Sequence, residues 1–427
     1  MKKIIVVGGG WAGVSAAVSA KNAGASVTLV ERTDMLLGTG LVGGIMRNNG
    51  RFTATEEAIA LGGGEVFEVI DKNARHKNIE FPGHKHSSLY DIAAIEPAIK
   101  ELLISKGIEI LLESRAKDVK VENNKITAIV LDNDECISGD VFIDTTGTAG
   151  PMNNCTKYGN GCAMCVLRCP SYGGRVSIAG KAGVKERMGE KPDGTIGAMS
   201  GSCKLLKESL SEEIVKKLDS TGVAVIPIPK HMQKDESKLS KKACQQYALK
   251  EFAENIVLLD TGHAKLMNPF YPLNELREIP GFKKARYEDP YSGNMGNSMR
   301  YMAMAPRDNA LKVIGIENLF CAGEKAGLLV GHTEAIVTGT LAGHNAVCYA
   351  LGKQLLILPN ELAIGDAIEY VKEAMTTPEG MGLKFTFSGS VYFTRMKEKG
   401  LYTTDIAAIK AKVEKVGLTD IFKKNIA

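Results

Sequence analysis

The chain opens on an alternation of short apolar strands and a helix that is typical of parallel α/β proteins. Ile4–Val7 is a β-branched run of the kind found in buried parallel strands. A helical pattern rich in alanine and valine follows and extends to about Ala23, where Gly24 ends it. A second apolar run, Val27–Val30, ends at the acidic Glu31. This stretch predicts a strand–helix–strand unit.

The same alternation of strand and helix patterns returns further along the chain, after a long interruption. It predicts a helix over Leu89–Lys106, strands over Ile108–Leu112, Val119–Val121, Lys125–Leu131, Gly139–Gly147 and Asn318–Glu324, and a helix over Thr333–Leu351. Residues 150–290 lack this alternation, and we interpret them as an inserted substrate domain with helices at about 203–220 and 240–255. Residues 359–427 are lysine-rich and amphipathic, which predicts helices that cap the molecule or a neighbour.

Residues 53–88 show neither the helical nor the strand spacing of apolar residues clearly, and they contain three histidines, His76, His84 and His86. The last two are spaced as H-x-H and can hold a metal ion or contact an anionic substrate. We favour a solvated loop for this stretch.

The first strand leads directly into the glycine pattern Gly8-x-Gly10-x-x-Gly13. The first glycine allows a tight turn, the second lets a pyrophosphate approach the backbone, and the third lets helix and strand pack closely. The start of the helix offers free N–H groups to the phosphates. Glu31 can accept hydrogen bonds from a ribose diol and would repel a 2′-phosphate. Together these features predict a dinucleotide site.

Composition narrows the function classes only modestly. The 427 residues can bury a large core in two or three domains, and 44% hydrophobic with 24% charged residues is ordinary for a soluble protein. A net charge of +4 does not argue for a nucleic-acid partner. No apolar run approaches the roughly 18 residues of a membrane span, so we expect a cytoplasmic protein without a membrane partner.

With these stretches in place, the chain resembles flavoproteins of the glutathione-reductase-like FAD fold, and within them the GidA/MnmG family. The residues that carry the resemblance are the glycine pattern with Glu31, Asp144-Thr-Thr-Gly147, Leu276-Arg-Glu-Ile-Pro-Gly281 with Ala285, the segment Leu319–Gly327, and the small-residue pattern from Gly331 to Ala346. The resemblance covers roughly residues 1–150 and 270–350.

The resemblance implies an α/β fold with a discontinuous Rossmann-like FAD-binding domain (residues 1–150 and 291–352), an inserted α+β substrate and redox-cysteine domain (151–290) and a short helical C-terminal tail (353–427). Glu31 would bind the adenosine ribose, and Glu324 the ribityl chain. The FAD-binding residues that it implies are Gly8, Gly10, Trp11, Ala12, Gly13, Glu31, Arg32, Gly38, Gly43, Ala116, Gly147, Gly323, Glu324, Gly331, Thr333 and Glu334.

The start of the helix at residue 332 is a candidate for catalysis. The resemblance places the backbone N–H groups of residues 332–334 at the pyrimidine edge of the flavin, where a helix N-terminus stabilises negative charge on the reduced ring. His332 can add a proton or a second donor, or it can simply cap the helix. We hold the two roles equal.

A run of cysteines follows the strand that ends near Gly147: Cys155, Cys162, Cys165 and Cys169, the last before a proline. The spacings are similar to part of a bacterial ferredoxin ligand run, and thiolates suit iron–sulfur clusters or zinc. The alternatives are a catalytic thiol/disulfide pair, most simply Cys162 with Cys165, and inert packing. We favour a [4Fe–4S] cluster, with Cys203 and Cys321 as candidate extra members.

We therefore favour an FAD-dependent oxidoreductase with an iron–sulfur or redox-thiol relay near the flavin. We expect a small-molecule or protein redox partner, such as a ferredoxin-like protein, and a homo-oligomer. One alternative is a shortened GidA-like enzyme acting on tRNA. It is not favoured, because the cysteine loop of GidA-type proteins is replaced by Thr39-Gly-Leu-Val-Gly43. A second alternative is a non-catalytic flavin-bearing assembly subunit.

Three arginines in the middle of the chain can recognise an anionic substrate: Arg175, Arg277 and Arg300. Exposed arginines more often form surface salt bridges. We favour that role for each of them.

Overall fold

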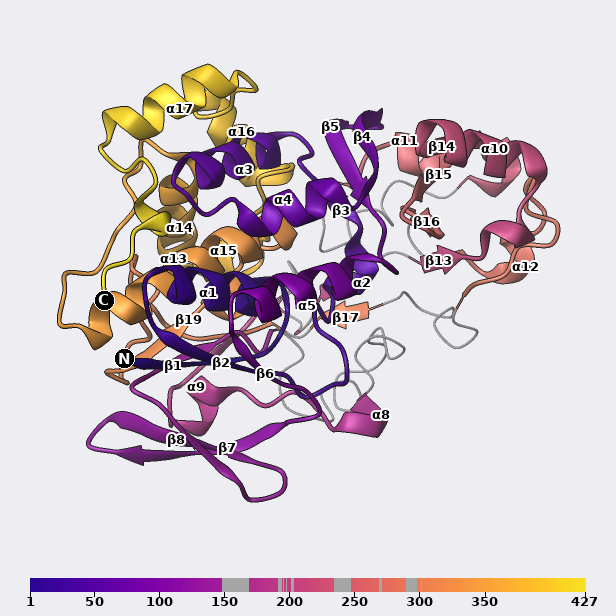
Figure 1. Cartoon of the computed structure of the whole chain (residues 1–427). Helices are drawn as coiled ribbons and strands as arrows, with labels where there is room; N and C mark the ends of the chain where they lie inside the picture. Colours follow the sequence, from indigo (N-terminus) through magenta and orange to yellow (C-terminus); the bar gives the residue numbers. More distant parts are fainter. Residues whose placement is uncertain are drawn as a thin grey trace.

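A computed structural model describes residues 1–147, 169–190, 194, 196, 198–200, 203–233, 247–268, 271–288, 298–300 and 302–427. At its centre is a five-stranded parallel sheet in the order β19-β10-β1-β2-β6 (Figure 1). Its strands are β1 (Lys3–Val7), β2 (Ser26–Val30), β6 (Glu109–Leu111), β10 (Val141–Asp144) and β19 (Leu319–Cys321). Val7 pairs with both Val30 and Asp144, so the three central strands end level with one another. The expected return of distant strands to the first sheet is confirmed.

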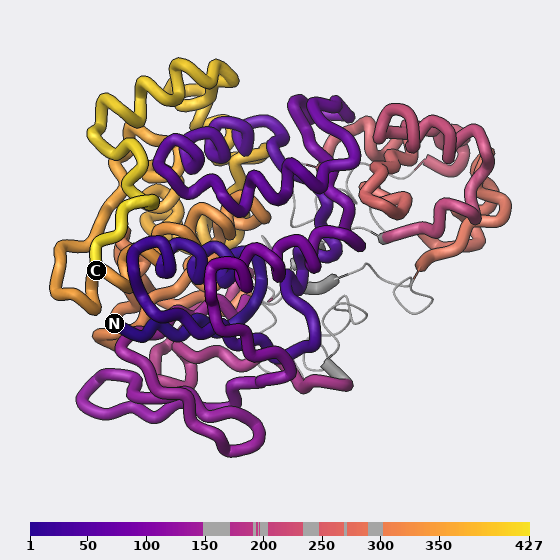
Figure 2. The backbone as a smooth tube through the Cα atoms, viewed as in Figure 1, coloured from indigo at the N-terminus to yellow at the C-terminus, as the bar shows by residue number. Residues whose placement is uncertain are grey.

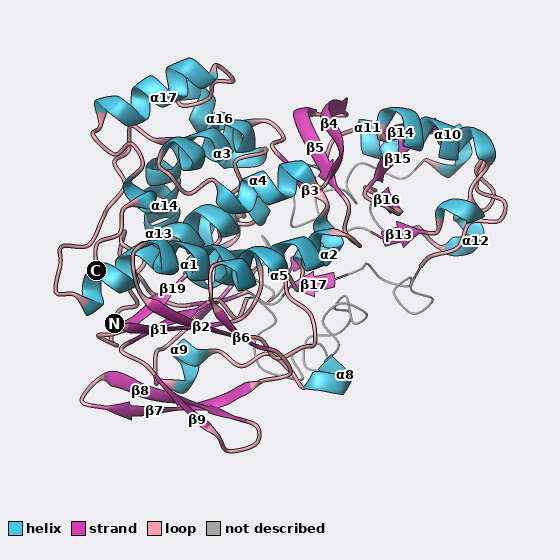
Figure 3. Cartoon of the chain, in the orientation of Figure 1, coloured by secondary structure: helices cyan, strands magenta, loops and turns pink. Residues whose placement is uncertain are grey.

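Two layers cover this sheet (Figure 3). On one face lie the helices α1 (Trp11–Asn22), α5 (Ile95–Ser105) and α13 (His332–Ala350). On the other face lies an antiparallel sheet of β7 (Ala116–Glu122), β8 (Lys125–Leu131) and β9 (Cys136–Ser138). Asn123 and Asn124 turn the predicted β7–β8 hairpin with φ of 50° and 59°.

Helices α1 and α13 approach closely because small residues line their contact. A β-carbon on Gly339 or Gly343 would lie 2.2 Å from the carbonyl oxygen of Ala12 or Ala16, respectively. The Ser19 hydroxyl also donates to the carbonyl oxygen of the second helix at Thr340, at 2.7 Å. The alanine- and glycine-rich composition of both helices therefore reflects backbone contact across the layer.

The stretch for which we favoured a solvated loop is regular structure, and that prediction is wrong. It contains α3 (Gly50–Ala60), α4 (Glu65–Lys72), β4 (Ala74–Phe81) and β5 (His84–Tyr90), and β5 also pairs with β3 (Ile45–Met46). His84 is 2% exposed, with Nδ1 3.0 Å from the amide nitrogen of Asn48. Because β5 extends to Tyr90, the helix predicted from Leu89 begins only at Ile95.

The inserted part of the chain forms a second, antiparallel sheet, which we call the outer sheet. It has the order β13-β16-β15-β14 and consists of β13 (Cys203–Leu205), β14 (Val223–Pro227), β15 (Asn255–Asp260) and β16 (Ala264–Leu266). Helices α10 (Glu212–Thr221), α11 (Glu251–Glu254) and α12 (Leu273–Leu276) accompany it. The helix predicted over 203–220 is therefore wrong in its first half, which is a strand and a turn. Of the helix predicted over 240–255, the described part holds only α11.

Short elements connect these layers. They are α2 (Gly40–Gly43), α8 (Cys169–Tyr172), α9 (Ile178–Lys181), β11 (Arg187–Met188), β12 (Ala198–Ser200), β17 (Ser298–Arg300), β18 (Ala303–Met304), and the 3₁₀ turns η1 (Lys207–Ser209), η2 (Lys230–Met232) and η5 (Gly323–Ala326).

The C-terminal region contains α14 (Ala363–Ala374), α15 (Pro378–Met381), α16 (Ser390–Glu398), α17 (Ile406–Lys415) and the turn η6 (Ile421–Lys423). It does more than cover the surface, because Phe385 and Phe387 between α15 and α16 are fully buried. The chain ends beside its beginning (Figure 2), where Ile426 N–H donates to the Ala23 carbonyl oxygen at 3.1 Å. The predicted α/β class with a Rossmann-like sheet and a helical C-terminal region is confirmed. Within the described residues, no helix combines the length and apolar character needed to cross a bilayer.

Candidate functional site

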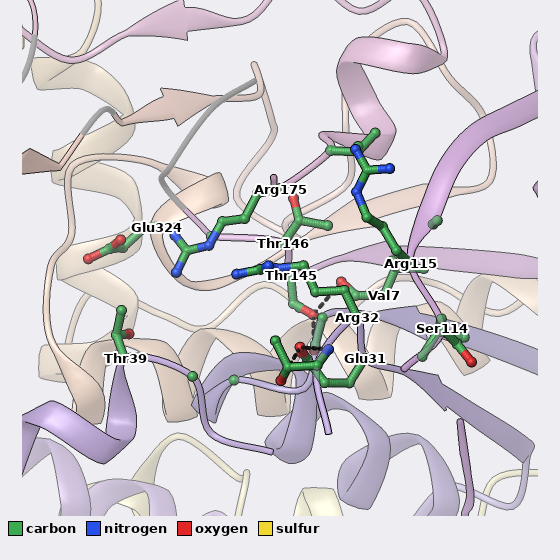
Figure 4. Close-up of a pocket in the computed structure, with 18 residues that line it drawn as sticks. Val7, Glu31, Arg32, Thr39, Ser114, Arg115, Thr145, Thr146, Arg175 and Glu324 are labelled. Atoms are coloured by element: carbon green, nitrogen blue, oxygen red, sulfur yellow. Dashed lines mark hydrogen bonds between the residues drawn. The ribbon is translucent and has the colours of Figure 1, made fainter. Parts of the chain in front are cut away.

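A cleft that is partly open to solvent lies at the carboxyl ends of the central strands (Figure 4). Together with the open solvent at its mouth, it holds about 730 Å³ of space not filled by protein atoms. Val7 and Val30, which end β1 and β2, line it together with Thr145, which follows β10. The chain passes from β1 to β2 on one side, while β10 adds on the other side of β1. Ligands of open α/β sheets bind where the strand order reverses in this way.

The glycine pattern that joins β1 to α1 and extends into the first turn of the helix has a different role at each position. Gly8 has a φ of +107°, and a β-carbon there would lie 2.4 Å from the Thr145 carbonyl oxygen. A β-carbon on Gly13 would lie 1.8 Å from the Gly8 carbonyl oxygen. At Gly10, by contrast, a β-carbon would meet no protein atom within 4 Å, and this residue lines the cleft. The loop therefore keeps space free at the start of α1, where backbone N–H groups favour an anion.

Glu31 lies at one end of the cleft with its carboxylate fixed by the loop. Its Oε2 accepts the Gly9 N–H at 2.7 Å, and its Oε1 accepts the Thr33 N–H at 2.9 Å and the Thr33 hydroxyl at 3.0 Å. The residue is 8% exposed. A carboxylate oxygen can accept more than one hydrogen bond, so Glu31 retains capacity for the hydroxyl groups of a ligand.

Glu324 lines the same cleft from a segment far away in sequence. It lies in η5, directly after β19, the last strand to join the sheet. Figure 4 shows Glu324 at the left of the view and Glu31 at the lower centre, close to Thr145. The cleft is thus lined by two carboxylates, Glu31 and Glu324, and by glycines of the loop after β1.

The structure separates the predicted cofactor residues into two groups. Those that line the cleft are Gly8, Gly10, Glu31, Arg32, Gly38, Ala116, Gly147 and Glu324. Those that support the loops behind it or lie beside it are Trp11, Ala12, Gly13, Gly43, Gly323, Gly331, Thr333 and Glu334.

His332 begins α13 and packs against the glycine-rich loop beside the cleft. A β-carbon on Gly43 would lie 1.6 Å from the imidazole Cε1, so no larger residue fits there with the ring in place. The Tyr90 hydroxyl lies 3.3 Å from Nδ1 of His332, and the ring centroids of His332 and Trp11 are 6.4 Å apart. Trp11 and Tyr90 meet edge to face at 5.8 Å. The histidine is therefore held in an aromatic cluster.

The outer sheet reaches the same glycine-rich loop. Lys265 on β16 is 5% exposed, and its Nζ donates to the Val42 carbonyl oxygen at 2.5 Å. A β-carbon on Gly44 would lie 2.3 Å from the methyl carbon of Thr261. The inserted segment thus fixes the loop against which His332 packs.

The side chain of Glu334 is directed away from the cleft. Both of its oxygens lie 3.1 Å from Nε of Arg51 on α3, in an ion pair in which the glutamate side chain is 0% exposed. Its Oε1 also accepts the Thr386 hydroxyl at 2.6 Å and the Phe387 N–H at 2.9 Å. The carboxylate therefore joins α13, α3 and the C-terminal region.

Two arginines that we did not favour as site residues from the sequence line the cleft. Arg115 was not singled out, and Arg175, for which we favoured a surface salt bridge, lines the cleft near Gly147. The pair of glycines directly before Arg175 is the only local signal that could have revealed it. Arg277 has a structural contact, donating from Nε to the Ala285 carbonyl oxygen at 3.0 Å.

Most of the predicted cysteine cluster lies outside the described residues. Cys155, Cys162 and Cys165 lie outside the described residues, and for Cys169 only the backbone, in α8, is described. Among the described residues, no three or more histidine, cysteine, aspartate or glutamate side chains are grouped so that they could hold a metal ion. The pair His84 and His86 therefore belongs to no such group. Burial raises the pKa of the Cys321 thiol to about 12, so this candidate extra ligand is held as a neutral thiol.

Comparison with known proteins relates the chain to a family of flavoproteins and to their fold. A family model described as glucose inhibited division protein A matches residues 3–271 and 271–354. A methylenetetrahydrofolate–tRNA-(uracil-5-)-methyltransferase, TrmFO, of Anoxybacillus flavithermus is 43% identical over 58 residues, which make up 14% of this chain and only 13% of that relative.

Two solved structures of Aquifex aeolicus GidA share 15% identity with this chain and cover 97% of it. The TM-score is 0.65 for the form II crystal, 76% of which is covered, and 0.61 for form I, 78% of which is covered. At this identity the likeness concerns the fold alone.

Proposed function

The chain belongs to the GidA family, and we propose that it is an FAD-dependent oxidoreductase. The observation that carries the proposal is the cleft at the strand-order switch, where Gly10 leaves space at the start of α1 between the carboxylates of Glu31 and Glu324. FAD has a diphosphate flanked by two polyhydroxyl groups. Carboxylates suit the hydroxyl groups and a helix N-terminus suits the diphosphate, so the residues present fit this cofactor.

Bound FAD would supply two-electron redox chemistry. The chain's own contribution is to hold the dinucleotide: Glu31 would accept hydrogen bonds from the adenosine ribose, and Glu324 from the ribityl hydroxyl groups. The first turn of α13 carries backbone N–H groups and partial positive charge at its start, which favour a ligand that gains negative charge.

His332 would hold the proton that accompanies electron transfer. It stands at the first position of α13, so its imidazole lies near the same N–H groups. Its Nδ1 faces the Tyr90 hydroxyl, and Nε2 would be the ring nitrogen that exchanges a proton with a substrate. Gly331 is the N-cap of α13 and His332 the first helical residue, and the role of His332 in capping the helix stays the alternative prediction.

The proposal is tested by the absorbance spectrum of the purified protein and by reconstitution. We expect the flavin bands after incubation with FAD, and bleaching of those bands when a physiological donor is added. Protein that takes up no FAD would contradict the proposal. Bound FAD that neither a nicotinamide nor a ferredoxin reduces would instead favour the assembly-subunit alternative.

A second candidate function is redox modification of tRNA. The family match and the local similarity to TrmFO, a relative named for its action on tRNA, favour it. A filter-binding titration with tRNA tests this candidate. Salt-dependent binding below micromolar concentration would support it, and no binding would exclude it.

The electron relay at Cys155, Cys162, Cys165 and Cys169 stays a prediction, as do the ferredoxin-like partner and the homo-oligomer. Anaerobic purification followed by iron and sulfide analysis tests the cluster. Flavin without iron, together with unchanged turnover in Cys162→Ser and Cys165→Ser, would remove the relay. Light scattering would establish the oligomeric state.

A further inference from the structure

A short segment, residues 173–176, borders the cleft and is held there by two arginines. Nη1 of Arg32 donates to the Gly173 carbonyl oxygen at 2.6 Å, and Nε of Arg115 donates to the Gly174 carbonyl oxygen at 2.7 Å. Arg32 follows β2 of the main sheet and Arg115 precedes β7 of the neighbouring antiparallel sheet, and both line this edge of the cleft. Two successive carbonyl groups just before Arg175 are therefore fixed to this edge.

The chain is fixed equally firmly after the segment. Oδ2 of Asp144, at the end of β10, accepts the Ala179 N–H at 2.9 Å. Lys325, which is 1% exposed, forms an ion pair with Glu186 and donates to the Ser177 hydroxyl at 2.9 Å. Anchored on both sides, the backbone of Arg175 has little freedom to move relative to the glycine loop.

The side chain of Arg175 extends into the cleft. Its Nη1 lies 3.2 Å from the position that a β-carbon on Gly147 would occupy. Figure 4 shows the guanidinium group between Glu324 and the Thr145–Thr146 pair, on the cleft side of the segment. The cleft therefore has negative charge at its two ends and a full positive charge between them.

We propose that Arg175 binds the diphosphate of the dinucleotide, and that Arg32 and Arg115 are positioning residues that hold the segment carrying Arg175 at the cleft. The inference rests on the proposed function, because the dinucleotide is FAD. A diphosphate placed near two carboxylates is repelled by both, and a helix N-terminus offers only about half an elementary charge. A guanidinium group offers a full charge and a planar fork of donors that matches phosphate oxygens.

The test compares ligands that contain the diphosphate with one that lacks it. Apoprotein of the wild type and of Arg175→Ala is titrated with FAD, ADP and riboflavin by calorimetry. We expect Arg175→Ala to bind FAD and ADP about ten- to hundredfold more weakly, the usual effect of losing a hydrogen bond to a charged group. Riboflavin should bind both proteins equally within about twofold, and the salt dependence of FAD binding should be smaller in the variant.

Three further variants keep this test interpretable. Arg175→Lys retains the charge and should recover part of the FAD affinity, which separates phosphate binding from a folding defect. Arg286→Ala removes an exposed arginine outside the cleft lining and should change nothing. Arg115→Met leaves Arg175 in place but releases Gly174. It should weaken ADP binding and increase hydrogen exchange in the peptide that contains residues 173–176.

The outcomes distinguish the inference from the proposed function. Wild-type protein that binds neither FAD nor ADP would overturn both. Wild-type protein that binds FAD, with Arg175→Ala binding it as tightly or losing riboflavin to the same extent, would overturn the role of Arg175 alone.

Discussion

The Tyr90 hydroxyl lies between the Gly40 carbonyl oxygen, 2.5 Å away, and Nδ1 of His332, 3.3 Å away. A hydroxyl group has one proton, and the carbonyl oxygen can only accept it. The tyrosine oxygen therefore accepts from His332, which places the imidazole proton on Nδ1 and leaves a lone pair on Nε2. Burial raises the pKa of Tyr90 to about 12, so this hydroxyl keeps its proton.

Tyr90→Phe should release this tautomer. In ¹⁵N NMR at about pH 8.5, the wild type should show the Nδ1–H tautomer of His332 and the variant a mixture of tautomers. The variant should also lose about 1–2 kcal/mol of unfolding free energy, because the Gly40 carbonyl oxygen loses its donor. An unchanged tautomer in the variant would show that Tyr90 does not orient the ring.

The glycine loop predicts opposite effects for two alanine substitutions. Gly10→Ala places its methyl group where no protein atom lies within 4 Å, and the φ of −70° suits alanine. Stability should change by less than about 0.5 kcal/mol, while FAD affinity falls about tenfold or more. In Gly13→Ala the added β-carbon would lie 1.8 Å from the Gly8 carbonyl oxygen, so the variant should lose more than about 2 kcal/mol of unfolding free energy. Thermal denaturation and FAD titration measure both, and equal FAD affinity in Gly10→Ala would contradict the placement of the ligand.

Removing only one partner of the buried ion pair between Arg51 and Glu334 should lower the unfolding free energy strongly. Arg51→Met leaves a fully buried carboxylate without its cation, and we expect a loss of about 3–5 kcal/mol in denaturant unfolding. The double variant Arg51→Met/Glu334→Leu should recover part of that loss, since no charge then remains.

The exposed pair of Lys216 and Glu212 is the matched control for this experiment. Both side chains are more than 70% exposed, and Lys216→Met should cost less than about 0.5 kcal/mol. A loss of that small size in Arg51→Met would show that the buried pair does not hold α3 to α13.

Glu57 should make stability depend on pH. Its carboxylate accepts the N–H groups of Ala363 and Ile364 at the start of α14, and burial raises its pKa from 4.5 to about 7. The folded state then binds the proton more tightly than the unfolded state, so this stabilisation is complete below about pH 4.5 and is lost as the pH rises to about 7. Between about pH 4.5 and 7, the wild type should lose about 3 kcal/mol of unfolding free energy more than Glu57→Gln does.

Urea unfolding across this pH range measures the effect. The curves of the wild type and Glu57→Gln should diverge between about pH 4.5 and 7, whereas Glu68→Gln, on an exposed position of α4, should follow the wild type. Parallel curves for the wild type and Glu57→Gln would mean that Glu57 titrates normally.

Sequence reasoning worked where the cause was local. The run Ile4–Val7, the turn at Gly8 and the stop at Gly24 follow from side-chain branching and backbone freedom within a few residues. It failed over residues 53–88. There β4 is a polar and mostly exposed strand, whereas its neighbour β5 is mostly buried. His84 on β5 is buried because residues from other parts of the chain cover it. A local pattern of mixed polarity cannot distinguish that arrangement from a loop.

The sequence by itself determined the parallel α/β sheet and the glycine loop that opens the cleft, because strand period, helix period and tight turns depend on neighbours in the chain. Only the tertiary structure decided which charges meet there. Arg175 enters the cleft because Arg32 and Arg115 hold the carbonyl groups before it, and Glu334 turns away because Arg51 pairs with it. Those partners lie far apart in sequence, and Coulomb attraction and hydrogen bonding act on distance in space, which no local pattern records.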